Sequence, residues 1–175
     1  MEKFKVLISE EEIQSRVKEL AMTIEVDYKD KQPVVICMLK GAVYFFADLT
    51  KHIRLPLLLD FARLSSYRNN TESGEMMLYH DISTDIEGKD VILVEDIVDS
   101  GKTLNYFKAL LLKKNPASIK ICALLDKKER REVDICADYV GFDIPNSFVV
   151  GYGLDYAEKY RYFPFIAELL DPEND

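Results

Sequence analysis

Three carboxylates stand beside residues that could bind a phosphate. Glu95, Asp96 and Asp99 follow or end the apolar run VILVE, and the next residues are Ser100, Gly101, Lys102 and Thr103. The nucleotide-triphosphatase pattern GxxxxGK[ST] would need glycine where the chain has Asp96, so that pattern fails. What remains is a strand, a turn and a helix, whose N–H groups and hydroxyls can hold one phosphate at the positive helix end.

The carboxylates require a partner other than phosphate, and a sugar phosphate provides one. Glu95 and Asp96, at the carboxyl end of the strand, can accept hydrogen bonds from vicinal ribose hydroxyls and favour a metal or a developing positive charge. Asp99 lies at the turn, close to the expected reacting carbon, and is a candidate general base. Any one of them could instead be a solvated turn residue or a helix cap. Together they favour a sugar-phosphate site.

The elements that must position these groups follow an alternating order. The apolar runs VVICML, LLLDFA, VILVE and IKICALL alternate with helix-like segments, which predicts an α/β fold with a mainly parallel sheet. Ser9-Glu10-Glu11-Glu12 predicts a capping box, followed by a helix with an apolar face at 13, 17, 20, 21 and 24. A second helix is expected from about Thr103 to Lys113. Residues 64–76 are polar and predict a long mobile loop.

Composition limits the class of protein. The 175 residues suit a single domain spanning 1–175, and 48% apolar residues can form a sizeable core. MEKFKVLISEEE has only a short apolar run and no segment approaches bilayer length, so we expect a cytoplasmic protein without a membrane partner. Cys37, Cys122 and Cys136 are odd in number, and two lie in apolar runs, which favours buried reduced thiols. The net charge of −8 disfavours a general nucleic-acid partner. His52 and His80 indicate no zinc site.

Several segments together carry a family resemblance. VILVEDIVDSGKT resembles the phosphoribosyl-diphosphate motif of type I phosphoribosyltransferases, and the wider chain resembles their hypoxanthine-guanine branch. The resemblance extends through LKG at 39–41, SSY at 65–67, LLDKKERR and YVGFDIPNSFVVGYGLDYAEKYR. It implies the type I phosphoribosyltransferase fold, a central mainly parallel sheet flanked by helices with a small hood from the terminal segments. The implied reaction, which belongs to purine salvage, joins a 6-oxopurine to 5-phosphoribosyl-1-diphosphate and releases pyrophosphate.

The resemblance assigns roles within the acidic motif. Residues Asp99, Ser100, Gly101, Lys102 and Thr103 would bind the 5′-phosphate, and Glu95 and Asp96 would address the ribose hydroxyls with Mg²⁺ nearby. Carboxylates fixed beside an oxocarbenium-like sugar help most where charge develops. Asp99 would accept the N7 proton of the purine, or restrain it by a hydrogen bond, as N9 attacks.

The pyrophosphate is assigned to two distant segments. Lys40 and Gly41 would bind it through backbone groups, in a loop that in this family often has a cis peptide before the lysine, and Gly41 permits close approach. Arg161 would contact it, since guanidinium suits bidentate oxygen recognition. Asp155, grouped with the purine site, would coordinate a second Mg²⁺ on pyrophosphate. Without the resemblance, Lys40-Gly41 could be an ordinary turn and Arg161 a surface cation.

Base choice is assigned to Lys127, Phe148 and Val149. An ammonium has only donors, so Lys127 can bond the 6-oxo group of hypoxanthine or guanine but not the 6-amino group of adenine. Phe148 would stack on the purine and the backbone of Val149 would contact its edge. Taken alone, Lys127 could be one cation in the basic surface run with Lys128, Arg130 and Arg131, and Phe148 could belong to the core.

The resemblance also implies a lid and an assembly. Ser66 and Tyr67 match a loop that closes over the site and excludes water, although Arg68-Asn69-Asn70 is bulkier than the family pattern. A homodimer or homotetramer is implied, and Tyr44-Phe45-Phe46 indicates a buried or subunit-facing helix. Three alternatives stay open at this point: a xanthine-specific enzyme, an RNA-binding regulator of the same fold, and a nucleotide-binding protein without catalysis.

Overall fold

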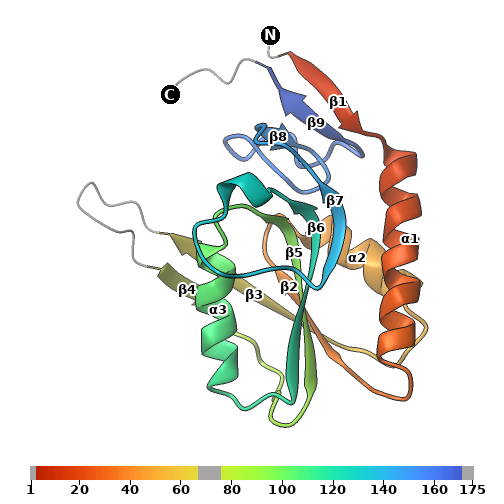
Figure 1. Cartoon of the computed structure of the whole chain (residues 1–175), viewed down its shortest axis with the longest axis vertical. Coiled ribbons are helices and arrows are strands. Elements are labelled where there is room, and N and C mark those ends of the chain that lie inside the picture. Colours follow the sequence, from red (N-terminus) through yellow and green to blue (C-terminus); the bar gives the residue numbers. More distant parts are fainter. Residues whose placement is uncertain (1–2, 67–75, 171–175) are drawn as a thin grey trace.

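The computed structural model of the chain describes residues 3–66 and 76–170 (Figure 1). The helices are α1 (Glu10–Asp27), α2 (Val43–His52) and α3 (Lys102–Leu112), with a short 3-10 helix at Lys128–Arg130. The strands are β1 (Phe4–Ile8), β2 (Val34–Met38), β3 (Leu58–Ser66), β4 (Met76–His80), β5 (Asp90–Val98), β6 (Ser118–Asp126), β7 (Tyr139–Asp143), β8 (Val149–Val150) and β9 (Ile166–Leu169).

The described residues form a six-stranded sheet in the order β4-β3-β2-β5-β6-β7. β2, β3, β5, β6 and β7 pair in parallel, and β4 joins the edge antiparallel to β3. The four apolar runs of the sequence are β2, β3, β5 and β6, so the predicted α/β class with a mainly parallel sheet is confirmed. Their parallel order brings the carboxyl ends of these strands to one edge, where ligands of such sheets bind.

Helices cover both faces of this sheet. Side chains of successive strand residues point to opposite faces, so Val35 and Cys37 of β2 pack with α1 and α2, whereas Val34 and Ile36 pack with α3. Burial on both faces explains why all five residues of β2 are apolar and buried. The core therefore has two layers, and β5, which carries the acidic motif, lies between them.

The two predicted helices form as expected. Ser9 Oγ accepts a hydrogen bond from the Glu12 N–H at 3.2 Å, and Glu12 Oε2 accepts one from the Ser9 N–H at 2.8 Å, which completes the capping box. The apolar face of α1, Ile13, Val17, Leu20, Ala21 and Ile24, is buried. α3 begins at Lys102, one residue before the predicted start, and buries Leu104, Phe107 and Leu111.

A small second sheet lies beyond the carboxyl ends of the parallel strands (Figure 1). β1 and β9 pair antiparallel, with Phe4 opposite Leu169, and β8 pairs with β9 through Val149 opposite Glu168. This sheet joins the two terminal segments, as the family resemblance implied. It is the hood of the molecule, and it holds the segment 149–161 over the main sheet.

Two expectations need correction or refinement. The predicted loop spanned residues 64–76, but residues 64–66 belong to β3 and Met76 begins β4, because these two strands pair there. The rest of that predicted loop, residues 67–75, lies outside the described residues.

Cys37 and Cys122 are buried free thiols as predicted, whereas Cys136 is a free thiol exposed to solvent. Among the described residues, the helices are too short or too polar to cross a bilayer.

Candidate active site

A pocket of about 320 Å³ opens at the carboxyl ends of β2 and β5, beneath the hood. Its lining gathers predicted residues from three distant parts of the chain: Lys40, Gly41, Glu95, Asp96, Asp99, Gly101, Thr103, Asp155 and Arg161. Apolar residues from the strand ends and from α3 complete the wall, among them Met38, Leu39, Leu64 and Leu104. The pocket therefore places carboxylates, a helix N-terminus and cations around one space.

The phosphate end of the pocket depends on Gly101. This residue is the N-cap of α3 and has φ +81°, in the left-handed region that favours glycine. A Cβ at this position would also lie 2.6 Å from Ile135 Cγ2. Gly101 has no side chain that could cap α3, whereas Ser9 caps α1. The Lys102 N–H donates a long hydrogen bond of 3.4 Å to Ser100 Oγ. The turn can therefore offer N–H groups to a phosphate at the positive end of the helix.

Glu95 and Asp96 are adjacent, partly buried carboxylates at the end of β5. The Asp96 N–H donates to Glu95 Oε1 at 3.1 Å, and the Ile97 N–H donates to Asp96 Oδ1 at 2.8 Å. Burial raises the pKa of Glu95 well above its ordinary value, and the neighbouring Asp96 charge raises it further. Burial also raises the pKa of Asp96, although backbone N–H groups and the Arg161 charge oppose this. A pair so arranged gains from a cationic ligand.

This raised pKa predicts an effect of pH on stability. Between the ordinary carboxyl pKa of about 4.3 and the raised value, native Glu95 holds a proton that the unfolded chain has released. The free energy of unfolding should therefore fall as pH rises through this window. Glu95→Gln removes the titration, so its stability relative to the original protein should increase as pH rises through the window.

The measurement is urea denaturation of the ligand-free protein at a series of pH values, with Glu19→Gln as the control. Glu19 is an exposed carboxylate that pairs with Arg16 on α1, away from the pocket. If the difference in unfolding free energy between Glu95→Gln and the original protein did not change with pH, Glu95 would not carry the raised pKa.

The loop after β2 lies against the acidic pair. The peptide bond between Leu39 and Lys40 is cis, as the family resemblance implied. A Cβ on Gly41 would lie 1.6 Å from Asp96 Oδ2, so only glycine fits without displacing that carboxylate. On the hood side, a Cβ on Gly153 would lie 1.9 Å from the Gly41 carbonyl oxygen. Gly41 is thus packed between the acidic motif and the hood.

Arg161 organises the hood side of the pocket. Its Nη2 lies 2.8 Å from Asp155 Oδ1, and its Nη1–H donates to the Gly153 carbonyl at 2.7 Å. Glu158, which the sequence analysis did not single out, lies 3.0 Å from Lys40 Nζ and 3.3 Å from Arg161 Nη2. One carboxylate therefore bridges the two cations assigned to pyrophosphate. In the sequence, Glu158 is only an acidic residue three positions before Arg161. Its contact with Lys40, which is distant in the sequence, could not be predicted from that spacing.

Of the residues grouped with the purine, Asp155 lines this pocket, whereas Lys127, Phe148 and Val149 do not. Lys127 lies beside the phosphate turn, residues 99–103. Lys127 is buried, and its N–H donates to the Val98 carbonyl at 3.0 Å, directly before Asp99. Burial lowers the pKa of Lys127, and the Asp99 charge partly offsets this. Phe148 is 46% exposed, and its ring meets Tyr156 edge-on at 5.6 Å, so part of it is open for stacking. Val149 is buried in β8.

Other predicted residues lie apart from this lining. Ser100 and Lys102 belong to the phosphate turn, but Lys102 Nζ pairs with Glu132. Ser66 is the last residue of β3, and Tyr67 lies outside the described residues.

The basic run Lys128, Arg130 and Arg131 is not a uniform surface patch. Lys128 pairs with Asp143 at the surface, and Arg130 Nε lies 3.0 Å from Asp99 Oδ1. Arg131, in contrast, is largely buried.

Comparison with known proteins identifies the family of the chain. Residues 9–157 match the model of the phosphoribosyl transferase domain family. The chain is 53% identical over 166 residues to hypoxanthine-guanine phosphoribosyltransferase of Bacillus subtilis (strain 168), covering 94% of this chain and 92% of that protein. A Bacillus anthracis hypoxanthine-guanine phosphoribosyltransferase crystal structure, with HEPES in its active site, aligns with a TM-score of 0.92 at 51% identity, covering 97% and 100% of the chains.

A Staphylococcus aureus hypoxanthine phosphoribosyltransferase structure aligns with a TM-score of 0.91 at 46% identity, covering 95% of this chain and 91% of that one. The family match, the sequence identity and the fold agree with one another. The chain belongs to the phosphoribosyl transferase domain family.

Proposed function

We propose that this protein transfers the 5-phosphoribosyl group of 5-phosphoribosyl-1-diphosphate to N9 of hypoxanthine or guanine, a purine salvage reaction. The observation that carries the proposal is the pocket itself, in which the phosphate turn, the acidic pair and the cations Lys40 and Arg161 face one space. This arrangement matches a substrate with phosphate at one end, a ribose in the middle and pyrophosphate at the other. The names of relatives about half identical to the chain agree with it.

In the proposed reaction, N9 of the purine forms a bond to C1′ while the bond from C1′ to the pyrophosphate oxygen breaks. The bonding electrons leave with pyrophosphate, and the sugar passes through an oxocarbenium-like state. The proton on N7 moves to the Asp99 carboxylate. Glu95 and Asp96 hold the ribose hydroxyls and place negative charge near the sugar carbon as it becomes cationic, which lowers the barrier.

The choice of base tests the role of Lys127. Because Lys127 is buried and has only donors, it suits the 6-oxo group and leaves the 6-amino group of adenine without an acceptor. The experiment measures kcat/KM for hypoxanthine, guanine, xanthine and adenine with 5-phosphoribosyl-1-diphosphate and Mg²⁺. We expect adenine to be at least about 10³-fold poorer than hypoxanthine.

Activity on adenine comparable to hypoxanthine would overturn the Lys127 assignment. A preference for xanthine would make the protein the xanthine-specific enzyme instead. No product from any purine, in folded protein, would overturn the proposed function, and RNA binding at physiological salt would then favour the regulator.

Mg²⁺ is the proposed cofactor, and the residues present fit it. Hard carboxylate oxygens are the ligands this ion prefers, and the buried acidic pair would be relieved by a cation. Within the described ranges, no cluster of three or more candidate ligands could hold a metal by itself. Glu95 and Asp96 would hold one Mg²⁺ and Asp155 a second, each with oxygens of the substrate as further ligands. The ion held by Asp155 would neutralise the charge that pyrophosphate carries away.

Glu158 competes with pyrophosphate in this proposal. Its carboxylate bridges Lys40 and Arg161, the two cations assigned to pyrophosphate, so 5-phosphoribosyl-1-diphosphate would displace it. Glu158→Gln removes the competing charge and should lower KM for 5-phosphoribosyl-1-diphosphate by up to about fivefold, the range of an exposed ion pair. Glu19→Gln is the control, since it breaks an exposed pair on α1. A raised KM in Glu158→Gln would mean that Glu158 helps to bind the substrate.

The assembly, domain and compartment assignments are also proposals. Exposed apolar side chains gather on α2, β3 and β4, namely Tyr44, Leu59, Phe61, Met77 and Tyr79. They support a homodimer or homotetramer. Light scattering should then give two or four times 20.2 kDa, and one thermal transition would agree with a single domain over 1–175. The buried free thiols Cys37 and Cys122 support a cytoplasmic location, which cell fractionation tests.

A further inference from the structure

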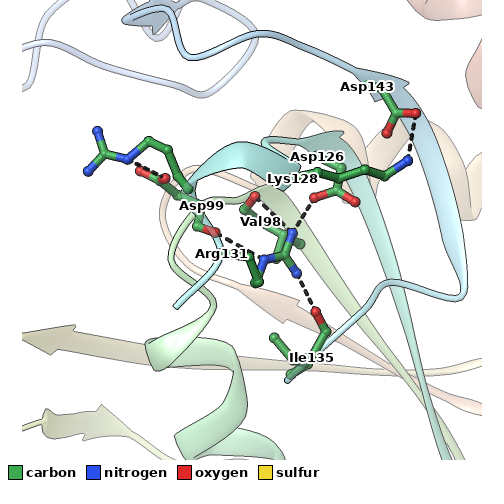
Figure 2. Close-up of polar contacts among 8 residues, drawn as sticks. Val98, Asp99, Asp126, Lys128, Arg131, Ile135 and Asp143 are labelled. Carbon is green, nitrogen blue, oxygen red and sulfur yellow. Dashed lines mark hydrogen bonds and ion pairs between the residues drawn. The ribbon is translucent and has the colours of Figure 1, made fainter. Parts of the chain in front are cut away.

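Arg131 lies between the phosphate turn and the segment that carries Lys127. Figure 2 shows its guanidinium pointing toward the ends of two strands, with Val98 and Asp99 on one side and Asp126 on the other. Nε–H donates to the Asp99 carbonyl at 3.2 Å, and Nη2–H donates to the Val98 carbonyl at 3.5 Å. Nη2 also pairs with Asp126 Oδ1, and Nη1–H donates to the Ile135 carbonyl. A single side chain thus joins the ends of β5 and β6.

The Arg131–Asp126 pair is built into the fold rather than placed at its surface. The Arg131 side chain is 16% exposed and that of Asp126 is 5% exposed. A Cβ on Gly101 would lie only 3.1 Å from Arg131 Cδ, so the arginine side chain packs against the phosphate turn. A buried charge requires a partner, and each of these groups supplies it for the other. The fixed fork of guanidinium donors, which lysine lacks, fits several carbonyls and a carboxylate at once.

The two strand ends carry the two groups that must meet on the purine. Asp99 follows β5 and is the proposed base for the N7 proton, whereas Lys127 follows β6 and is the proposed donor to the 6-oxo group. These purine atoms are neighbours on one edge of the ring system. The Lys127 N–H and the Arg131 guanidinium both donate to the Val98 carbonyl. Arg131 also donates to the Asp99 carbonyl and to the Asp126 carboxylate. The spacing between Asp99 and Lys127 therefore depends on these contacts.

We propose that Arg131, with Asp126 as its counter-ion, is a positioning residue that holds Asp99 and Lys127 at the spacing required by the N7–O6 edge of the purine. The inference deepens the proposed function and rests on it. Arg131 acts through Asp99 and Lys127, and it does not contact the reacting atoms. Neighbouring Arg130 pairs with the Asp99 carboxylate itself, so adjacent arginines hold the main chain and the side chain of one residue.

A double-mutant cycle separates positioning from a general structural role. Arg131→Lys keeps the charge and loses the fork, so kcat for inosine monophosphate should fall by about 10- to 100-fold. In the Asp99→Asn background the same substitution should lower kcat by a clearly smaller factor, because there is no base left to misplace and only the placement of Lys127 is lost. Both comparisons use protein shown to be folded by its thermal transition.

The control is Lys128→Gln, which breaks the exposed 2.8 Å pair with Asp143 and lies in the 3-10 helix that ends directly before Arg131. It should leave kcat and KM within about twofold of the original protein. If Arg131→Lys does not fold, Asp126→Asn goes through the same cycle with the same criteria.

The positioning role would be overturned if Arg131→Lys lowered kcat by the same factor in the original protein and in Asp99→Asn. It would also be overturned if Arg131→Lys did not lower kcat in the original protein. Wild-type protein that makes no inosine monophosphate would overturn the proposed function instead, so the two failures are distinguishable.

Discussion

Asp99→Asn is expected to lower kcat for inosine monophosphate formation by roughly 10²- to 10⁴-fold. The carboxylate stands beyond the end of β5, in the lining of the pocket, with Oδ1 3.0 Å from Arg130 Nε. Asparagine keeps nearly the same shape but cannot take the N7 proton at neutral pH. The loss should therefore fall on kcat and kcat/KM for the base together, as for an interaction made only in the transition state.

The measurement for Asp99→Asn is steady-state turnover with hypoxanthine, together with calorimetric binding of 5-phosphoribosyl-1-diphosphate. Binding should change by no more than a few-fold, because the phosphate turn keeps its N–H groups. Asp143→Asn is a matched control, since Asp143 is an exposed carboxylate that pairs with Lys128. A kcat within about fivefold of the original protein would remove Asp99 from the role of general base.

Gly41→Ala is the second change with a large expected effect. The added Cβ would lie 1.6 Å from Asp96 Oδ2, so either the loop after β2 or the acidic pair must move. The loop cannot retreat freely, because Gly153 of the hood packs against the Gly41 carbonyl. Displacement of about 1 Å in such a site costs on the order of 100-fold, so kcat/KM for 5-phosphoribosyl-1-diphosphate should fall by about that factor.

Gly88→Ala is the control for Gly41→Ala. Gly88 has φ +67° and open space around the position of a Cβ, so alanine there strains the backbone without touching the pocket. It should lower the unfolding temperature and leave the kinetic constants near those of the original protein. If Gly41→Ala behaved in the same way, the close approach of Gly41 to Asp96 would have no part in substrate binding.

The central strands and the long helices were predictable because their signals are local. Continuous apolar runs marked β2, β5 and β6, since strands covered on both faces need apolar residues at nearly every position. An apolar run also marked β3, although its Leu59 and Phe61 are exposed. The capping box marked the start of α1. The edge strand β7 and the two-residue β8 were not predicted individually. β7 mixes polar and apolar residues and β8 is too short to carry a pattern, so their strand state comes from the neighbours they pair with.

The acidic motif was also largely predictable, because its residues are consecutive. Residues 95–103 pass directly from β5 through the turn into α3, so local backbone geometry alone places the carboxylates beside the helix N-terminus. The left-handed glycine at 101 follows from the same local geometry. Composition and residue order therefore determined the fold class and the phosphate turn, and the family resemblance supplied the distant residues.

Tertiary structure alone decided how those distant residues meet. Parallel pairing of β2 with β5 sets Lys40 and Gly41 beside Asp96, and the hood brings Asp155 and Arg161 to the same pocket. The bridging of Lys40 and Arg161 by Glu158, and the burial of Arg131 within a run that read as surface cations, also depend on packing. Residue types fix which groups can ionise or bond, but strand register and packing of the hood fix which of them come within reach.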